Sequence, residues 1–464
     1  MSDHSASLHD AWALAQHIGR DGTRALAALE ASIEAARTHA SLGAVSRLDP
    51  EPARRRIEEA VRCPSRHLTG VPTLAKDLGG PFLSLPVRAG SRAVPLAPVE
   101  ESELGFRLRS VGLNAFGTST VPEFGLSLGC EPAAGPIARN PLDPSRTPGG
   151  SSGGAAAAVA RGIVAIAHAT DAGGSIRVPA ACCGLYGIKP SRGAVPGGPD
   201  FTNLMGGLAS ESMLCRSMSD LCRVFHDIVG GDGLFPEPAL PGALEAPRIG
   251  VLLPPDGIDE ERLNVLEDAA RVLSPASAGP VHIDPRHVEP LLADSAEVFD
   301  RMVCASLASL CETLALDESL MEPLSRAVAA RGRAMGVTRL WAAFDLMARV
   351  ACRTAALFDT IDVLVLPMLS RSPPPIGHFP TDHDDVEAHW QRLRRFAPNA
   401  TWANVSGCPA ISLPCGRDAH GLPLPVQLMA RVGADRTLLR TASRLDQEGR
   451  WQQRFAVAGM PLDG

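Results

Sequence analysis

A stretch dense in glycine, proline and serine, residues 129–154, interrupts a chain that otherwise alternates between helical and strand-like patterns. Such a composition cannot form a regular helix or strand. Around it, short apolar runs predict buried strands at Val71–Ala75, Leu113–Gly117 and Ile163–Ala169, and helical patterns occupy 102–110 and Ala155–Arg161. Strands of this kind, alternating with helices, are typical of α/β domains whose sheet is covered on both faces. We therefore expect an α/β fold around a mostly buried central β-sheet flanked by helices.

The remaining segments extend this pattern. Residues 8–60 predict helices, and a Pro- and Gly-rich connection at 230–246 leads to a strand at Arg248–Leu252. Further helices are expected at about 259–275 and 290–358, strands at Ile361–Leu366, Ala410–Leu413 and Val426–Ala430, a polar loop at 370–386, and a last helix after 430. No internal repeat is evident.

Composition narrows the class of protein. The chain has 464 residues, of which 45% are hydrophobic and 20% charged, as in ordinary globular proteins. A net charge of −7 and 4% aromatic residues disfavour a nucleic-acid partner. Eleven cysteines, without a CxxC pair, favour reduced thiols and a cytoplasmic location. The longest run of small apolar residues, Gly153–Ala169, contains Arg161 and His168, so no membrane span is expected.

Lysine is nearly absent. Of 44 Lys and Arg residues, only Lys76 and Lys189 are lysines, and the other 42 are arginines. A buried lysine can lose its proton and act as a base, whereas arginine keeps its proton in proteins. One of the two lysines is therefore a candidate proton carrier.

The other candidate catalytic groups lie in two Gly/Ser clusters. They are Gly149-Gly150-Ser151-Ser152-Gly153-Gly154 and Asp171-Ala172-Gly173-Gly174-Ser175-Ile176-Arg177. One helix–strand unit separates them, which can return both serines to the same end of a sheet. The run Ala172–Ser175 offers consecutive backbone N–H groups that can surround an anion, as an oxyanion hole requires. Ser175, with a lysine base acting through Ser151, could then serve as a nucleophile.

Other interpretations of these patterns stay open. A Gly/Ser loop is often only a turn, and Gly149–Gly154 has phosphate-loop spacing but lacks the Lys-Ser/Thr pair. Ser152 also fits G-x-S-x-G, although no strand precedes it. The segment with His378, His383 and His389 is rich in metal-ligating side chains but has no fixed ligand spacing, and a solvated loop is favoured. Possible pocket residues, for which ordinary core is the simpler interpretation, are Leu126, Met205, Trp341, Phe344 and Trp402.

Together, Lys76 and the two clusters resemble the amidase signature enzymes, serine hydrolases with a Ser–cisSer–Lys triad. The resemblance spans roughly 60–240 and 355–450. Its motifs are Gly70–Asp77, Pro122-Glu123-Phe124-Gly125, Arg139-Asn140-Pro141, Pro148–Pro190, Val405-Ser406-Gly407-Cys408-Pro409-Ala410 and Gly421–Leu428.

The resemblance implies a mixed sheet and a single amidase domain over 1–464. Its parts would be an N-terminal helical segment (1–60), a core (61–240), a variable insert or cap (241–355) and the C-terminal part of the core (356–464).

It also implies roles for individual residues. Ser175 would be the nucleophile, Ser151 the bridging serine in a cis peptide and Lys76 the base. Ala172, Gly173 and Gly174 would form the oxyanion hole, and the supporting residues would be Ser152, Asp171 and Arg177. Lys189 would be structural, as a lysine that extends to solvent or forms an ion pair.

The expected activity is hydrolysis of a carboxamide C–N bond in a small, neutral substrate, with no metal or organic cofactor. The expected partners are the amide itself and possible further copies of the chain, without nucleic acid or membrane. One alternative is the glutamine-amidase subunit of a tRNA-dependent amidotransferase. A non-catalytic binding protein is a second alternative, which the joint presence of Lys76, Ser151 and Ser175 disfavours.

Overall fold

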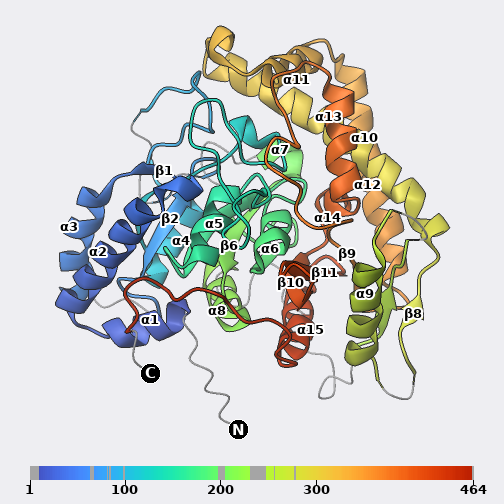
Figure 1. The fold of residues 1–464 in the computed structure, drawn as a ribbon. Helices are drawn as coiled ribbons and strands as arrows, with labels where there is room; N and C mark the ends of the chain where they lie inside the picture. Colours follow the sequence, from blue (N-terminus) through green and yellow to red (C-terminus); the bar gives the residue numbers. More distant parts are fainter. Residues whose placement is uncertain are drawn as a thin grey trace.

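Strands of a mixed sheet form the centre of the molecule (Figure 1). The computed structural model describes residues 10–62, 67–80, 82, 85–97, 100–196, 204–229, 247–254, 257–275 and 278–461. Within these ranges the sheet has the order β4-β6-β5-β10-β11-β9-β7-β8. Its strands are β4 (Ile166–Asp171), β5 (Tyr186–Lys189), β6 (Ser210–Cys215), β7 (Ile249–Val251), β8 (Val281–His282), β9 (Val363–Pro367), β10 (Ala410–Arg417) and β11 (Pro423–Ala430).

Both parallel and antiparallel neighbours occur in this sheet. Strands β9, β7 and β8 pair in parallel, and every other neighbouring pair is antiparallel. The residues of β4, β5, β6, β9 and β11 are all buried, which explains why these strands show no regular alternation of apolar and polar side chains.

Helices cover both faces. Helices α5 (Gly153–Arg161) and α6 (Arg177–Cys183) pack on one face, and α8 (Met218–Val229), α9 (Glu260–Leu273) and α15 (Asp435–Asp446) pack on the other. The expected mixed α/β sheet with helices on both sides is confirmed.

A smaller sheet lies against the β4 edge. It contains β1 (Val45–Leu48), β3 (Asn114–Ser119) and β2 (Pro72–Lys76), in that order. The Thr73 hydroxyl of β2 donates to the Ile166 carbonyl of β4 at 2.8 Å. The Lys76 N–H donates to Nδ1 of His168 at 3.3 Å, two residues further along β4. The two strands therefore run in the same direction, and Lys76 reaches the carboxyl end of β4.

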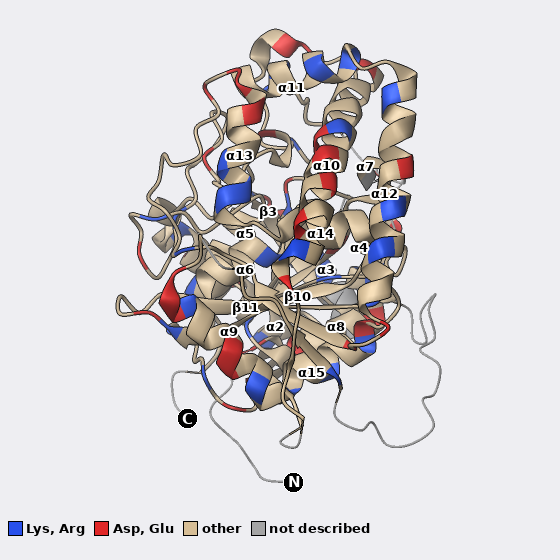
Figure 2. Cartoon of the chain, turned by 90° about the vertical axis from the view of Figure 1, so that its right-hand side faces the viewer, with Lys and Arg blue, Asp and Glu red and all other residues tan. Residues whose placement is uncertain are grey.

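The other helices belong to the two flanks of the molecule. Those of the first flank are α1 (Ala11–Ile18), α2 (Gly22–Thr38), α3 (Pro50–Arg62) and α4 (Glu103–Val111). The second flank, which we call the cap, contains α10 (Pro285–Thr313), α11 (Pro323–Arg333), α12 (Val337–Leu357), α13 (Val386–Phe396) and α14 (Ala400–Ser406), with the short α7 (Leu204–Gly207) beneath it. Acidic and basic side chains are mixed along the cap helices (Figure 2).

Most expected elements are present, with shifted ends. The all-helical interpretation of residues 8–60 is wrong at one place, because Val45–Leu48 pairs with β3 as a strand. The expected strand at Arg248–Leu252 forms as β7, whereas the preceding 230–246 connection lies outside the described residues.

Candidate active site

Lys76 lies at the end of β2 with its side chain fully buried. Its Nζ donates to the Ser151 hydroxyl at 2.8 Å and to the Thr170 hydroxyl at 2.8 Å. Burial disfavours the charged ammonium and lowers the pKa of Lys76 to about 7, although Asp171 and Glu211 act in the opposite direction. Near neutral pH a large fraction of Lys76 is thus an amine that can accept a proton.

A lowered pKa is not particular to Lys76, because Lys189 shares it. It is also buried, and burial lowers its pKa to about 7 as well. However, its Nζ donates to the adjacent Pro190 carbonyl at 2.5 Å. The prediction that this side chain extends to solvent is wrong, because β5 is an interior strand of the sheet. The contact with Ser151 is what distinguishes Lys76.

Ser151 is held by tight backbone packing. The Gly150–Ser151 peptide bond is cis, as the resemblance implies. A Cβ at Gly150 would lie 2.6 Å from the Ser127 carbonyl oxygen, so no larger residue fits there. Ser152 follows with its hydroxyl donating to the Thr170 carbonyl at 3.3 Å.

The same geometry decides against the G-x-S-x-G interpretation. Ser152 is fully buried and precedes α5 without a strand before it. Its N–H donates to the Ser175 carbonyl at 3.3 Å, which joins the two Gly/Ser loops.

Ser175 lies in the loop between β4 and α6, and Asp171 holds this loop. The carboxylate of Asp171 accepts the N–H groups of Gly174 at 2.7 Å and Ile176 at 3.2 Å. It also accepts two charge-assisted bonds from the Arg177 guanidinium, each 2.9 Å. Burial would raise the pKa of Asp171, but Arg177 and these donors hold it below its usual value.

Two residues outside the predicted set complete this support. The Arg177 guanidinium donates to the side-chain oxygens of Gln427 and Asn404, both at 2.7 Å. Asn404 also donates to the Asp171 main-chain carbonyl at 2.9 Å. Gln427 lies in the quoted Gly421–Leu428 motif and Asn404 directly precedes the Val405 motif, so proximity to a motif was the available signal.

The resemblance places Gly174 in the oxyanion hole, and this role stays a prediction. The Gly174 N–H points to Asp171, so this donor already has a partner. Within the described ranges, the N–H groups of Ala172, Gly173 and Ser175 have no hydrogen-bond acceptor. The backbone of Gly174 has a φ of 110°, a conformation that favours glycine at this position of the loop.

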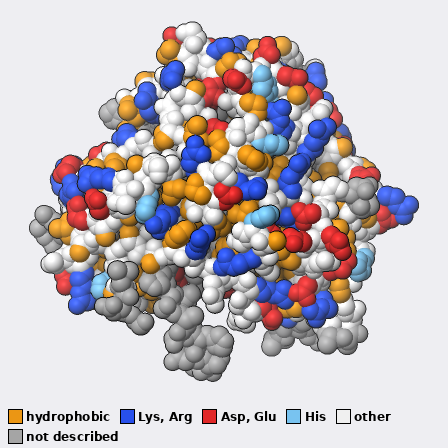
Figure 3. Space-filling model, in the orientation of Figure 1, with side chains coloured by type: hydrophobic (Ala, Val, Ile, Leu, Met, Phe, Trp, Pro, Cys, Tyr) orange, Lys and Arg blue, Asp and Glu red, His pale blue; other side chains and the backbone are white. Residues whose placement is uncertain are grey.

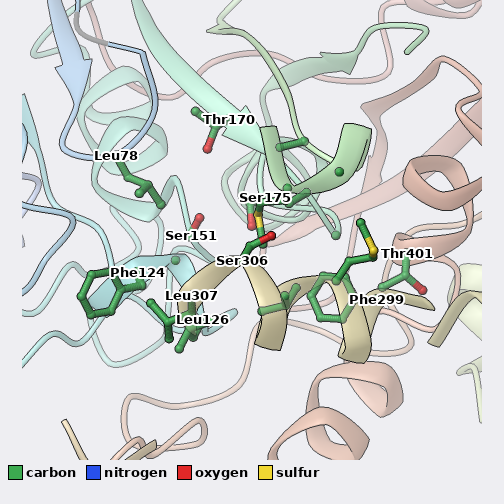
Figure 4. Close-up of a pocket in the computed structure, with 18 of the residues that line it drawn as sticks. Leu78, Phe124, Leu126, Ser151, Thr170, Ser175, Phe299, Ser306, Leu307 and Thr401 are labelled. Carbon is green, nitrogen blue, oxygen red and sulfur yellow. The ribbon is translucent and has the colours of Figure 1, made fainter. Parts of the chain in front are cut away.

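Ser151 and Ser175 open onto a cavity of about 480 Å³ beneath the cap. Figure 4 shows the two serines on one side and Phe299 and Ser306 of α10 opposite them. Phe299 covers the Ala172–Ser175 loop closely, because a Cβ on Gly173 would lie 2.6 Å from its ring.

The rest of the lining is mainly apolar. Of the possible pocket residues, Leu126, Met205 and Phe344 line the cavity. Trp341 is exposed, and Trp402 is buried with its indole N–H donating to Thr354.

The histidine-rich segment has its own structure. His389 is buried in α13 and hydrogen-bonds the Leu126 carbonyl at 2.9 Å, so the solvated-loop interpretation fails at this residue. Asp385 caps the same helix by accepting the Ala388 N–H. Among the described residues, no group of three or more His, Cys, Asp or Glu side chains is arranged to hold a metal ion.

A buried Ser–Ser–Lys cluster at the end of a mixed α/β sheet is typical of amide-cleaving serine hydrolases. The sequence model of the amidase family matches residues 27–439, so the chain belongs to the amidase family, whose signature motifs it carries. It is an enzyme of a class that acts on C–N bonds.

Individual relatives agree with this assignment. The chain is 32% identical over 404 residues to "Putative amidase AmiC" of Mycobacterium tuberculosis, and the aligned region covers 82% of each chain. It is 30% identical to the 6-aminohexanoate-cyclic-dimer hydrolase of Pseudomonas sp. strain NK87, covering 87% of both. A solved structure of a 6-aminohexanoate cyclic dimer hydrolase superposes with a TM-score of 0.84 at 29% identity, over 96% of this chain and 98% of that one.

Proposed function

We propose that this chain is a free-standing amidohydrolase that cleaves the C–N bond of small, neutral carboxamides through an acyl-enzyme on Ser175. The observation that carries the proposal is the 2.8 Å contact between Lys76 Nζ and Ser151 Oγ, at the wall of a cavity that Ser175 also lines. A lysine whose pKa is about 7 can exchange a proton with that serine at neutral pH.

In the proposed acylation step, Ser175 Oγ attacks the substrate carbonyl carbon. Its proton passes to Ser151 Oγ as Ser151 gives its own proton to Lys76. The N–H groups of Ala172, Gly173 and Ser175 are the donors available to the oxyanion. The C–N bond then breaks, and the amine leaves with the proton returned from Lys76 through Ser151.

Deacylation repeats the sequence with water. Water loses a proton through the same relay and attacks the Ser175 ester. The carboxylic acid is then released, and Ser175 regains its proton. Asp171 and Arg177 keep the loop in place throughout, because their ion pair lies entirely inside the protein.

The cavity favours a neutral, largely apolar substrate. In the described lining, the charged side chains are Glu211 and Arg394. Glu211 bonds His168, and Arg394 pairs with Glu387 at 2.9 Å. Relatives named for hydrolysing a cyclic dimer of 6-aminohexanoate, a neutral diamide with methylene chains, support the same substrate class.

We further propose a single amidase domain over 1–464, in which the 241–355 segment gives the cavity its shape. Residues from Ala296 to Phe344 of α10 and α12 line the cavity opposite the serines, which supports this division.

The glutamine-amidase alternative, as part of a tRNA-dependent amidotransferase, has weaker support. A solved structure of one chain of the glutamyl-tRNA(Gln) amidotransferase from Thermotoga maritima superposes with a TM-score of 0.66 at 22% identity, which is a likeness of fold. Glutamine carries two charged α-substituents, and the one basic side chain of the described lining, Arg394, is already paired with Glu387.

The test is product release by the purified chain, without tRNA or ATP. A panel of neutral linear amides, neutral cyclic amides and glutamine is assayed for ammonia, amine or acid. We expect turnover of neutral amides by the chain alone. Activity restricted to glutamine, and only with partner subunits, would favour the amidotransferase alternative.

A further inference from the structure

A second buried polar pair, His168 and Glu211, lies next to Lys76, because His168 accepts the Lys76 main-chain N–H and also bonds Glu211. His168 is on β4 and Glu211 on the neighbouring strand β6, where it is paired with Thr170. The imidazole Nε2 lies 2.9 Å from a carboxylate oxygen of Glu211, and both side chains are 1% exposed.

The hydrogen bonds determine which ring nitrogen of His168 carries the proton. The Lys76 main-chain N–H donates to Nδ1 of His168, so Nδ1 must be unprotonated. Nε2 therefore carries the ring proton and donates it to Glu211. The second carboxylate oxygen of Glu211 accepts the Gly80 N–H at 2.8 Å. The pair thus connects β4 and β6 to the backbone at Lys76 and, further along the chain, at Gly80.

The negative charge of Glu211 has no cationic partner of its own in the described ranges, because a neutral imidazole does not cancel it. The other titratable groups near Lys76 are accounted for. Asp171 also raises the pKa of Lys76, but its charge is paired with Arg177. Burial raises the pKa of Cys130 to about 12, so its thiol stays uncharged near neutral pH. Asp77, next in sequence, accepts the N–H groups of Arg88 and Gly90.

We propose that His168 and Glu211 are positioning residues for Lys76: the imidazole fixes its backbone, and the carboxylate stabilises the ammonium that forms during turnover. This inference rests on the proposed function, because it assumes that Lys76 alternates between amine and ammonium. An uncompensated ammonium inside the protein would be costly, and one buried carboxylate nearby reduces that cost.

The chain allows a direct measurement, because it contains only two lysines. Protein labelled with ¹³Cε-lysine gives two resonances, and Lys189→Met leaves that of Lys76 alone. The pH titration of this resonance reports the Lys76 ammonium without any need for catalysis. In a Glu211→Gln background the midpoint should move to lower pH by on the order of one unit, because a nearby negative charge is lost.

Two variants separate charge from structure. Glu211→Asp keeps the charge and should leave the midpoint close to that of the parent. Thr73→Val removes a buried β2–β4 hydrogen bond without removing a charge, and should also leave it unchanged. The acid limb of the pH profile of kcat/KM should follow the titration in all variants.

Two results would overturn the inference. The first is a Lys76 midpoint that is the same in the Glu211→Gln variant and its parent. The second is an unchanged pH profile with KM raised only for cationic amides, which would make Glu211 a substrate-binding group. Absence of amide turnover, with a midpoint that still shifts, would contradict the proposed function and leave the charge coupling standing.

Discussion

The two lysines have the same burial and a pKa lowered to the same value, about 7, so they form a natural matched pair. Only Lys76 contacts a serine of the site. We predict that Lys76→Met lowers kcat by about 10²–10⁴-fold, the usual contribution of general acid–base catalysis. Lys189→Met should keep most of the activity. Equal losses in both variants, measured on one neutral amide, would show that burial rather than the Ser151 contact matters.

Lys76→Arg tests the proton-transfer role more narrowly. Arginine keeps a positive charge at this position but does not release its proton. We predict a loss as large as that of Lys76→Met at every pH from 6 to 9. Recovery of activity at the alkaline end would contradict a base at this position.

The sequence identified the residues of the site better than their contacts. The family resemblance implied that Lys76, Ser151, Ser175, Asp171 and Arg177 form one site. In the structure Lys76 bonds Ser151, Asp171 bonds Arg177 and the Ser175 loop, and both serines line one cavity. The bond from the Gly174 N–H to Asp171 was not foreseeable, because it depends on the turn between β4 and α6. Asn404 and Gln427 reach the site from more than 220 residues away in sequence, through contacts that only folding creates.

At the scale of elements, α10 is the wall that faces the serines. Phe299 lies against Gly173 there, so its ring limits the space above the Ala172–Ser175 loop. We predict that Phe299→Ala raises the kcat/KM ratio of bulky to small acyl amides by about 10–200-fold, the range for a change in pocket volume. Trp341→Ala, at an exposed position of α12 that does not line the cavity, is the control and should leave the ratio unchanged. An unaltered ratio for Phe299→Ala would place the acyl group elsewhere.

Strands were predicted correctly where the apolar runs are long. They were missed where a segment is a strand only because it pairs with a neighbouring strand. The mainly apolar runs at β2 and β9 predicted strands because all residues of both strands are buried. β1 carries Ser46 and Arg47 and is a strand because it pairs with β3, which local sequence does not reveal. β5 and β6 were likewise not predicted, since both owe their place to pairing between β4 and β10.

At the scale of the whole molecule, acidic and basic side chains are interspersed over the face in Figure 3. No helix of the described residues is long and apolar enough to cross a membrane. At this scale, the buried titratable groups allow a clearer test than the surface charges, through the pH dependence of the free energy of unfolding.

Stability should rise with pH above about 7. Both lysines have folded pKa values near 7 and a reference value of 10.5, so the unfolded chain binds two more protons in between. Each contributes a slope of about 1.4 kcal/mol per pH unit to the free energy of unfolding. Buried cysteines such as Cys130 and Cys415, whose pKa is raised to about 12 from a reference of 9.0, reverse the trend as the unfolded thiols ionise near pH 9.

Urea unfolding at several pH values measures this slope. We predict that Lys189→Met removes about 1.4 kcal/mol per pH unit of the rise between pH 7 and 8.5, and that Thr73→Val leaves the slope unchanged. A slope that does not differ between wild type and Lys189→Met would mean that Lys189 is charged in the folded protein.

At acid pH, the ionisation of Asp171 determines how the stability of the protein changes. Its folded pKa lies below the reference value of 3.8, so its ion pair contributes stability that is present above that value and lost as pH falls through the folded pKa. We predict that Asp171→Asn destabilises the protein at pH 7, because it leaves the Arg177 charge buried without its partner, at a cost of about 3–5 kcal/mol. The difference from wild type should shrink below pH 4, and urea unfolding with wild type as reference checks it. A difference independent of pH would contradict the ion-pair account.

The most direct test of the central claim is the position of a covalent adduct. The purified chain is treated with a fluorophosphonate, digested, and analysed by mass spectrometry. The account predicts one phosphonylated serine, Ser175, with labelling abolished in Ser175→Ala and slowed in Lys76→Met. An adduct on Ser152, or labelling that persists in Ser175→Ala, would contradict it.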